Sequence, residues 1–375
     1  MIAKTRSVVS VPEGVLYVAF ELGKKQWKLA MTSGFGVAPV LQTVPSGDWA
    51  AVERAWAAGR QRLGLPARSR IVSGYEAGRD GFWIHRALVA RGCANRVVDS
   101  SSIEINRRAR RTKTDRIDAL KLVSMLVRVC LGEQRVWREV RVPSLEAEAA
   151  RHVSRERQAL TEERTRLINQ MRSWLATWGT ALPRRQPDGW WATVRDWTGA
   201  ALPASVQARL VRASQRLALL TEQLATLDAQ QTAAIQAAPA ASAAQRLVQL
   251  KGIAVTSASI LLDEGLTWRQ FENRRQIGGL LGFAPTPHAS GATMHEQGIS
   301  RAGNDRLQSV MVQLAWGWVH WQPTSTLTQW YRARFGTGAR ARKVGIVALA
   351  RKLLIALWRW ATHGILPTGA VLKTT

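Results

Sequence analysis

Cysteine and acidic residues are both scarce in this chain of 375 residues. Only Cys93 and Cys130 occur, with no Cys-x-x-Cys pair and no Cys and His residues at zinc spacing, which argues against a disulfide scaffold and a zinc finger. Any metal must then be held by oxygen ligands. No apolar run approaches the roughly eighteen residues of a membrane span, and no charged region followed by an apolar one opens the chain, so we expect a cytoplasmic protein.

The 26 acidic residues are outnumbered by 53 lysines and arginines, which gives a formal net charge of +27. Because this excess is spread along the whole chain, it indicates a polyanionic partner and favours nucleic acid over a membrane surface. Apolar residues make up 46% of the chain, which is ample for real cores. The length predicts two or three domains.

The first 142 residues alternate strand-like and helix-like patterns. Three β-rich runs separated by glycine-bearing turns are followed by a helical, a strand, a helical and a strand pattern, at residues 15–21, 27–32, 37–43, 49–63, 70–75, 81–91 and 96–98. The helical pattern after residue 114 completes the order βββαβαβα. This order is typical of a mixed sheet with helices on its faces, so we expect an α/β domain over residues 1–142.

Two aspartates begin the last of these helices. Thr114 is placed as an N-cap, so Asp115 and Asp118 fall in the first turn, where the helix dipole favours negative charge and the three-residue spacing puts both on one face. That face could hold a divalent cation. In the alternative, the two carboxylates only form ion pairs with neighbouring basic side chains, namely Arg111, Lys113 and Arg116.

Two glutamates are predicted at the ends of neighbouring strands. Glu21 ends the first strand and Glu76 follows the fourth, and strand ends converge in such folds, so these carboxylates can meet the two aspartates. Taken singly, Glu21 is typical of an ordinary strand-end charge and Glu76 of a turn residue before Gly78.

A run of arginines leads into the aspartate-bearing helix and is too dense for nearby acidic residues to neutralise. A phosphate backbone would neutralise it, so we expect nucleic-acid contacts from Arg107, Arg108, Arg110, Arg111, Lys113 and Arg116. The alternative is a solvated, charged surface.

Glu21, the Tyr75-Glu76-Ala77-Gly78 turn and the block at residues 114–119 together resemble the DEDD tetrad of the IS110 family of bacterial insertion-sequence transposases. The resemblance covers nearly the whole chain. It implies an RNase H/RuvC-like N-terminal domain in which Mg²⁺ or Mn²⁺ is bound by Glu21, Glu76, Asp115 and Asp118. Glu21 stands where the family usually has an aspartate, which is one methylene shorter.

Residues 143–240 are predicted to form a helical connector. Apolar residues at helical spacing run from Leu160 to Trp178, prolines and a glycine interrupt the pattern at 183–189, and a second helix then carries a heptad seam of Val206, Leu210, Ala213, Leu217, Leu220, Leu224 and Leu227. An antiparallel hairpin within the chain and a coiled coil between protomers would both bury this seam. The alanine-rich stretch 233–244 is predicted to be the linker to the next domain.

Residues 241–375 are predicted to form a helical C-terminal domain. Its first part resembles a helix-hairpin-helix element, in which the turn at Lys251 and Gly252 would present backbone N–H groups to a phosphate. A helix is expected over 268–281, and a basic helical segment over 332–360. We expect nucleic-acid contacts in this domain from Lys251, Gly252, Arg301, Arg306, Arg342 and Lys343.

Ser290 precedes a glycine, and a Ser-Gly pair is ordinarily part of a turn. The family resemblance implies a C-terminal Ser-Gly motif followed by a Gly-Asn-x-x-Leu helix, here residues 303–307, and it implies that Ser290 is the nucleophile. Ser300 is a competing serine, placed as a helix N-cap. His288 and His295 flank Ser290, but no Ser/His/Asp triad is evident, so we expect activation by a carboxylate-bound metal.

The sequence therefore predicts a DEDD transposase in which attack by Ser290 leaves a phosphoserine link that conserves bond energy for recombination. The resemblance implies a bacterial, nucleoid-associated homo-oligomer, a dimer or tetramer, whose partners are double-stranded donor and target DNA and a structured noncoding bridge RNA. The residues alone leave two other functions open. One is a RuvC-type structure-selective endonuclease with metal-activated water, and the other is a non-catalytic nucleic-acid-binding protein.

Overall fold

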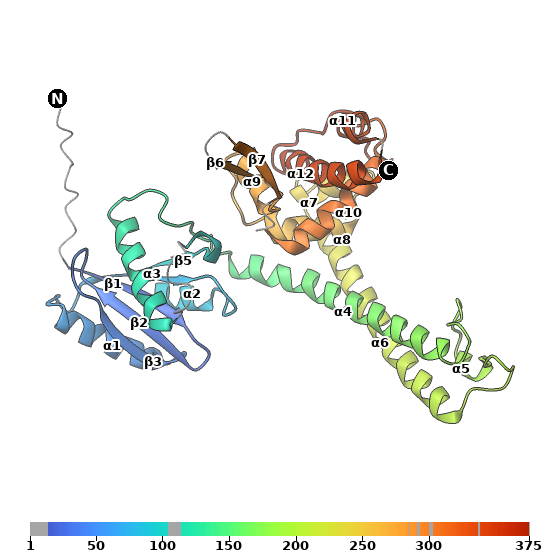
Figure 1. Cartoon of the computed structure of the whole chain (residues 1–375), viewed down its shortest axis with the longest axis horizontal. Coiled ribbons are helices and arrows are strands. Elements are labelled where there is room, and N and C mark those ends of the chain that lie inside the picture. The colour runs from blue at the N-terminus through green and yellow to red at the C-terminus, as the bar shows by residue number, and fades with distance from the viewer. Residues whose placement is uncertain are drawn as a thin grey trace. The chain divides into compact units, whose positions relative to one another are not determined.

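The computed structural model describes residues 14–103, 114–283, 285–290, 293–299, 303–336 and 338–374. The chain divides into two compact units, residues 1–142 and 143–375, and each is described by itself (Figure 1). Over the described ranges, no helix combines the length and the apolar character needed to cross a membrane.

The first unit is built on a five-stranded mixed sheet in the order β3-β2-β1-β4-β5. Strands β1, β4 and β5 are parallel, and β2 and β3 extend the sheet by antiparallel pairing. The elements are β1 (Val15–Leu22), β2 (Gln26–Thr32), β3 (Val40–Pro45), α1 (Trp49–Arg62), β4 (Arg70–Glu76), α2 (Trp83–Ala90), β5 (Ala94–Val98) and, after a short 3₁₀ turn, α3 (Asp115–Cys130). The predicted order βββαβαβα is confirmed (Figure 1).

Each face of this sheet carries its own hydrophobic core. Val18 and Phe20 of β1 pack with α1 and α2, whereas Tyr17 and Ala19 pack with α3, which is the two-residue period of a strand. Strand β1 is buried from Val15 to Phe20 and becomes half-buried only at Glu21. Because both faces of the strand are buried along most of its length, a polar side chain can reach solvent at its carboxyl end.

The second unit begins with two long antiparallel helices, α4 (Leu145–Ala176) and α6 (Ala204–Ala237), joined by a segment that contains the short α5 (Trp190–Thr193) (Figure 1). Arg157 pairs with Asp228, and the guanidinium of Arg209 lies 3.7 Å from the ring centroid of Trp174. These pairings run in opposite directions along the two helices. The predicted seam packs within this hairpin, where Leu210, Ala213 and Leu220 share a core with Leu167, Met171 and Leu175.

The remaining helices of the second unit surround a larger core. They are α7 (Ala243–Gln249), α8 (Val255–Leu261), the π-helical turn η3 (Leu262–Leu266), α9 (Arg274–Leu280), α10 (Asp305–Trp321), α11 (Thr326–Phe335) and α12 (Ala339–His363). Helix α12 contributes an apolar face to this core, where Ile346, Leu349, Leu353 and Leu357 are all buried.

Two sequence-based predictions for the second unit are wrong. The proposed linker at 233–244 is mostly helical, because α6 continues to Ala237 and buries Ile235. The helix expected from residue 268 starts only at Arg274, after the N-cap Asn273, since the Trp268 indole is directed back to the Asp263 carbonyl at 2.9 Å. The helical segment predicted over 332–360 is confirmed, as the end of α11 and most of α12.

A β-hairpin stands where no strands were predicted. Strands β6 (Pro285–Ser290) and β7 (Thr293–Ile299) pair antiparallel, with a register shift between Pro285 and Pro287. Prolines cannot donate a backbone hydrogen bond, so they are poor signals for a strand, but a two-stranded sheet consists only of edge strands and tolerates them.

Candidate active site

Glu21 and Glu76 stand at the same edge of the sheet. Strands β1 and β4 are parallel neighbours, and their last paired residues are Phe20 and Tyr75. Glu21 and Glu76 follow these two residues directly, so the register brings both glutamates to the carboxyl ends of adjacent strands. Glu21 is half-buried and Glu76 is exposed.

Helix α3 brings its aspartates toward the same edge. Burial raises the pKa of Tyr17, and Cys130 and Arg70 also act on it electrostatically, which puts the last residue of α3 near the starts of β1 and β4. The helix therefore runs antiparallel to these strands, and its first turn, with Asp115 and Asp118, lies toward their carboxyl ends.

The N-cap predicted at Thr114 is confirmed. Its hydroxyl accepts a hydrogen bond from the Ile117 N–H at 3.4 Å, which begins the helix at Asp115. Asp115 is exposed and Asp118 is half-buried, one residue before the fully buried Ala119. The cap thus fixes which turn of α3 carries the two carboxylates.

Topology places the four acidic residues toward one edge of the sheet, where they do not form a ligand cluster. Among the residues described here, which include all four, no group of three or more His, Cys, Asp and Glu side chains is arranged to hold a metal ion. The donor set itself consists of carboxylate oxygens, which fits Mg²⁺ or Mn²⁺ and does not fit a soft metal. Topology therefore supplies the common edge, and side-chain movement would have to supply the final ligand geometry.

Several predicted nucleic-acid contacts lie outside the described residues, namely Arg107, Arg108, Arg110, Arg111, Lys113 and Arg301. Arg116 is exposed on the first turn of α3, and Arg342 and Lys343 are exposed near the start of α12. These three side chains are available to a polyanion.

The turn between α7 and α8 explains the glycine at position 252. Gly252 has a φ of 91°, in the left-handed region, and a Cβ there would lie 3.0 Å from the Cβ of Trp321. The preceding Lys251 is exposed, its ammonium lies 5.9 Å from the Trp321 ring centroid, and its N–H donates to the Val371 carbonyl at 3.1 Å. Backbone conformation and packing against Trp321 both require the glycine.

Ser290 is the last residue of β6, and its backbone is opposite Thr293 of β7. In the same register, His288 is opposite His295, so both flanking histidines belong to this hairpin. The competing Ser300 lies outside the described residues. The candidate nucleophile thus stands at the tip end of a hairpin rather than in a simple turn between helices.

Arg306 is engaged inside the second unit, which corrects its assignment as a nucleic-acid contact. Its side chain is only 12% exposed, and its guanidinium donates to the Glu264 carboxylate at 3.0 Å and to the Ser154 hydroxyl at 3.1 Å. Arg155 binds the same carboxylate with two bonds of 2.9 and 3.1 Å, and Asn304 donates to it at 3.0 Å.

Sequence reasoning missed Glu264, although an Asp-Glu pair within the apolar run 258–266 was a signal. Glu264 is 1% exposed and lies in the π-helical turn η3, a local geometry that often marks functional sites. Burial alone would raise the pKa of Glu264, but the hydrogen bonds from Arg155 and Asn304 outweigh burial and lower the pKa to about 2. The buried carboxylate therefore stays ionised and saturated with donors.

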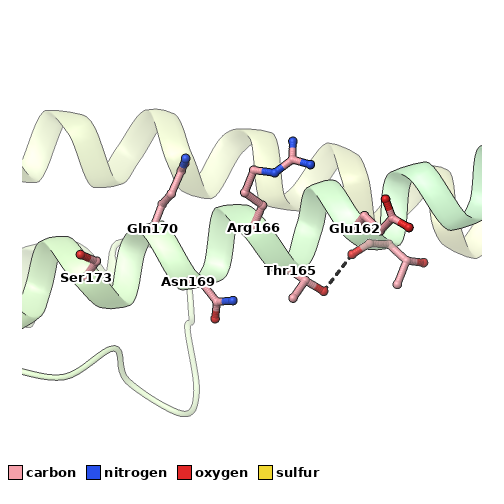
Figure 2. A pocket seen from close by; sticks show the side chains of 7 residues that line it. Glu162, Thr165, Arg166, Asn169, Gln170 and Ser173 are labelled. Atoms are coloured by element: carbon pink, nitrogen blue, oxygen red, sulfur yellow. Dashed lines mark hydrogen bonds between the residues drawn. The ribbon is translucent and has the colours of Figure 1, made fainter. Parts of the chain in front are cut away.

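An open pocket lies on the surface of α4 and involves none of the predicted site residues (Figure 2). Its lining side chains all come from α4 between Thr161 and Ser173, and the Thr165 hydroxyl donates to the Thr161 carbonyl at 2.9 Å. Glu162 and Arg166 are its only charged residues. This composition offers no catalytic group comparable to the carboxylates of the first unit or to Ser290.

Comparison with protein families assigns this combination of a mixed-sheet unit and a helical unit to the transposases. A family model for DEDD transposases, described as "Transposase", matches residues 68–178. The model described as "Transposase IS116/IS110/IS902 family" matches residues 244–329.

Relatives agree with this match along the chain. "Putative transposase y4rJ" of Sinorhizobium fredii is 38% identical over 98% of this chain and 97% of its own length. "Probable family 20 transposase" of Pseudomonas aeruginosa is 31% identical over 59% of this chain and 65% of its own. The "Transposase for insertion sequence element IS1328" of Yersinia enterocolitica is 27% identical over 56% and 62%. The chain belongs to the IS116/IS110/IS902 transposase family.

Asp263, next to Glu264, has a raised pKa, so the free energy of unfolding should depend on pH. Burial raises the pKa of Asp263 from its ordinary 3.8 to about 6, although the Ser154 hydroxyl and Arg306 oppose the rise. Because the folded pKa lies above the unfolded one, this contribution to stability is fully present below pH 3.8 and is lost as the pH rises through about 6. Asp263→Asn should therefore be more stable than the unchanged protein at pH 7.5, by up to about 3 kcal/mol.

The measurement is the free energy of unfolding of both proteins at pH 4.5, 6 and 7.5. The advantage of the variant should grow with pH, whereas Glu264, with a pKa of about 2, stays ionised throughout. Asp188→Asn, in the exposed loop before α5, is the control and should show no such trend. An advantage of Asp263→Asn that is constant from pH 4.5 to 7.5 would contradict the assignment.

Proposed function

We propose that this member of the transposase family cleaves and rejoins DNA strands through a serine–DNA intermediate that depends on a divalent metal. Glu21, Glu76, Asp115 and Asp118 would hold Mg²⁺ or Mn²⁺, which when bound would stabilise the negative charge that develops on the scissile phosphate. The observation that carries the proposal is the common edge shared by the carboxyl ends of β1 and β4 and the first turn of α3.

Ser290 would supply the nucleophile. Its Oγ would form a bond to phosphorus as a phosphorus–oxygen bond of the DNA backbone breaks, the serine proton would pass to solvent, and the released strand end would take up a proton as a hydroxyl group. Attack by the hydroxyl of another strand would reverse these bonds and free the serine. The phosphodiester energy is conserved in the phosphoserine link, so no external energy source is required.

The partners proposed for this activity are donor and target double-stranded DNA and a structured bridge RNA that pairs with both. The net charge of +27 and the exposed Arg116, Arg342 and Lys343 support a polyanionic partner. The bridge RNA, a homo-oligomeric state and a location at the bacterial nucleoid follow from the family alone.

The serine mechanism is tested by the bond that it forms. The protein incubated with labelled donor DNA and Mg²⁺ should give a band that migrates slowly on a denaturing gel and disappears after protease treatment. Ser290→Ala removes only the hydroxyl, so it should bind DNA normally but give no such band and no recombinant product. Ser300→Ala is the matched control and should retain the adduct.

Cleavage by Ser290→Ala at the rate of the unchanged protein, without an adduct, would replace this mechanism with metal-activated water, as in a RuvC-type nuclease. DNA binding without cleavage by the unchanged protein at any metal concentration would indicate a non-catalytic binding protein.

The metal site is tested by removing one negative charge at a time. Asp118→Asn keeps the size of the side chain and its place in α3 but weakens a metal ligand, so strand cleavage should fall at least about a hundredfold, while the melting temperature stays within a few degrees. Glu21→Asp restores the usual ligand of the family and should retain activity.

Mg²⁺ titrations of cleavage provide the second measurement for the metal site. Asp118→Asn should need a higher metal concentration for any residual activity. Full activity of Asp118→Asn at the metal concentration used for the unchanged protein would show that Asp118 is not a metal ligand.

The bridge RNA is tested by sequencing the RNA that copurifies with the protein when the complete insertion element is present. One enriched noncoding transcript from the element is expected, and its removal by ribonuclease should abolish recombination. Copurification of a random sample of cellular RNA, with recombination that ribonuclease does not affect, would contradict the bridge-RNA proposal. The positive charge of the protein would then serve DNA binding only.

A further inference from the structure

The β6–β7 hairpin that carries Ser290 leaves and rejoins the helical core at one place. Before the hairpin, the chain passes through Leu281 and Gly282, and after it the chain returns at Gly303. A Cβ on Gly303 would lie 2.4 Å from both the Gly282 nitrogen and the Leu281 carbonyl carbon. Only glycine permits this approach, so the two ends of the hairpin are pressed against each other.

Asn304, the next residue, fastens the returning end with three hydrogen bonds. Its backbone N–H donates to the Leu280 carbonyl at 3.0 Å, and its side-chain oxygen caps α10 by accepting from the Leu307 N–H at 2.9 Å. Its side-chain amide donates to Glu264 at 3.0 Å. One residue thus connects the segment before the hairpin, the helix after it and the π-helical turn η3.

The Glu264 side of this connection is rigid. The carboxylate is 1% exposed, and its oxygens also bind Arg155 of α4 and Arg306 of α10. A buried charge cannot exchange these partners for water without a large cost, so its position is fixed by the surrounding donors. Leu307 and Met311 of α10 are buried in the core of the same unit.

We propose that Asn304, held by the buried Glu264, is a positioning residue that sets the place from which the hairpin presents Ser290. This inference rests on the proposed function, since it concerns the serine of that mechanism. Misplacement of a reacting group by about 1 Å can cost about a hundredfold in rate, so loss of this link should slow the reaction of Ser290 without removing any reacting group.

The first experiment separates the link to Glu264 from helix capping. Asn304→Ser retains a side chain that caps a helix, but serine is too short to reach Glu264 and has no amide donor. At saturating donor DNA, formation of the Ser290–DNA adduct should slow at least about tenfold, whereas DNA affinity and the melting temperature should change little. A purely structural role would lower the melting temperature and would not produce this split.

The matched control is Asn273→Ser. Asn273 caps α9 in the same manner, with its side-chain oxygen accepting from the N–H groups of Arg275 and Gln276 at 2.9 and 3.2 Å. It should leave the rate of adduct formation unchanged. Equal slowing by Asn273→Ser and Asn304→Ser would overturn the inference, because capping alone would then explain the effect.

A double variant that exchanges the donor and the acceptor between positions 304 and 264 tests whether the link can be restored. Asn304→Asp keeps the cap but places two carboxylates together, and it should slow adduct formation as Asn304→Ser does. Adding Glu264→Gln restores a donor–acceptor pair, in which the new amide at position 264 donates to the new carboxylate at position 304, at the cost of one hydrogen bond from Arg155 to Oε2. The double variant should form the adduct faster than Asn304→Asp alone, and faster than Glu264→Gln alone; a double variant slower than both single variants would count against the link.

These outcomes are distinct from failure of the proposed function. Absence of any adduct in the unchanged protein would refute the serine mechanism itself. An adduct that forms normally in the unchanged protein and equally fast in Asn304→Ser would refute only the positioning role.

Discussion

The parallel pairing of β1 with β4 is the constraint on which the candidate catalytic edge depends. Parallel neighbours end on the same side of a sheet, so Glu21 and Glu76 are neighbours because Phe20 is paired with Tyr75. A slip of one residue would turn Glu21 into the core that is now filled by Phe20. Because both faces of β1 are buried, a change of register would be costly. The fixed register in turn fixes the positions of the two glutamates.

Helix α3 contributes two aspartates to this edge because its first turn lies toward the carboxyl ends of the strands. Ala119 and Leu122 bury one side of its N-terminal half against the sheet, so Asp115 and Asp118 can be carried at its free end. A negative charge in the first turn is favoured by the helix dipole, which makes two adjacent aspartates tolerable without a metal.

Much of the fold could be predicted from the sequence because its patterns are local. The order of helices and strands along the first unit, the cap at Thr114 and the seam of α6 all follow from periods of two or three to four residues and from capping chemistry. The β6–β7 hairpin escaped prediction because Pro285 and Pro287 suppress the strand signal. The sequence also placed Glu21 and Glu76 at strand ends, but the register that makes them neighbours is visible only in the structure.

The link between Glu264 and Asn304 could not be predicted, since its two residues are 40 positions apart and lie in unrelated local patterns. Sequence alone shows an acidic residue in an apolar run and a glycine followed by asparagine. The two residues are connected only by the packing of the folded chain. A carboxylate buried in the core needs hydrogen-bond donors, and Asn304, at the end of the hairpin, supplies one of them.

The chain uses its abundant arginines in two different ways, and net charge does not distinguish them. Arg155 and Arg306 both bind a buried carboxylate and stabilise the second unit, but only Arg306, with a side chain 12% exposed, is thereby withdrawn from phosphate. Arg116 and Arg342 are exposed, and a partner can reach them. With 53 basic and 26 acidic residues, acidic side chains are the limiting partners. The buried Glu264 therefore makes Arg306 a structural residue, whereas the exposed arginines remain accessible to nucleic acid.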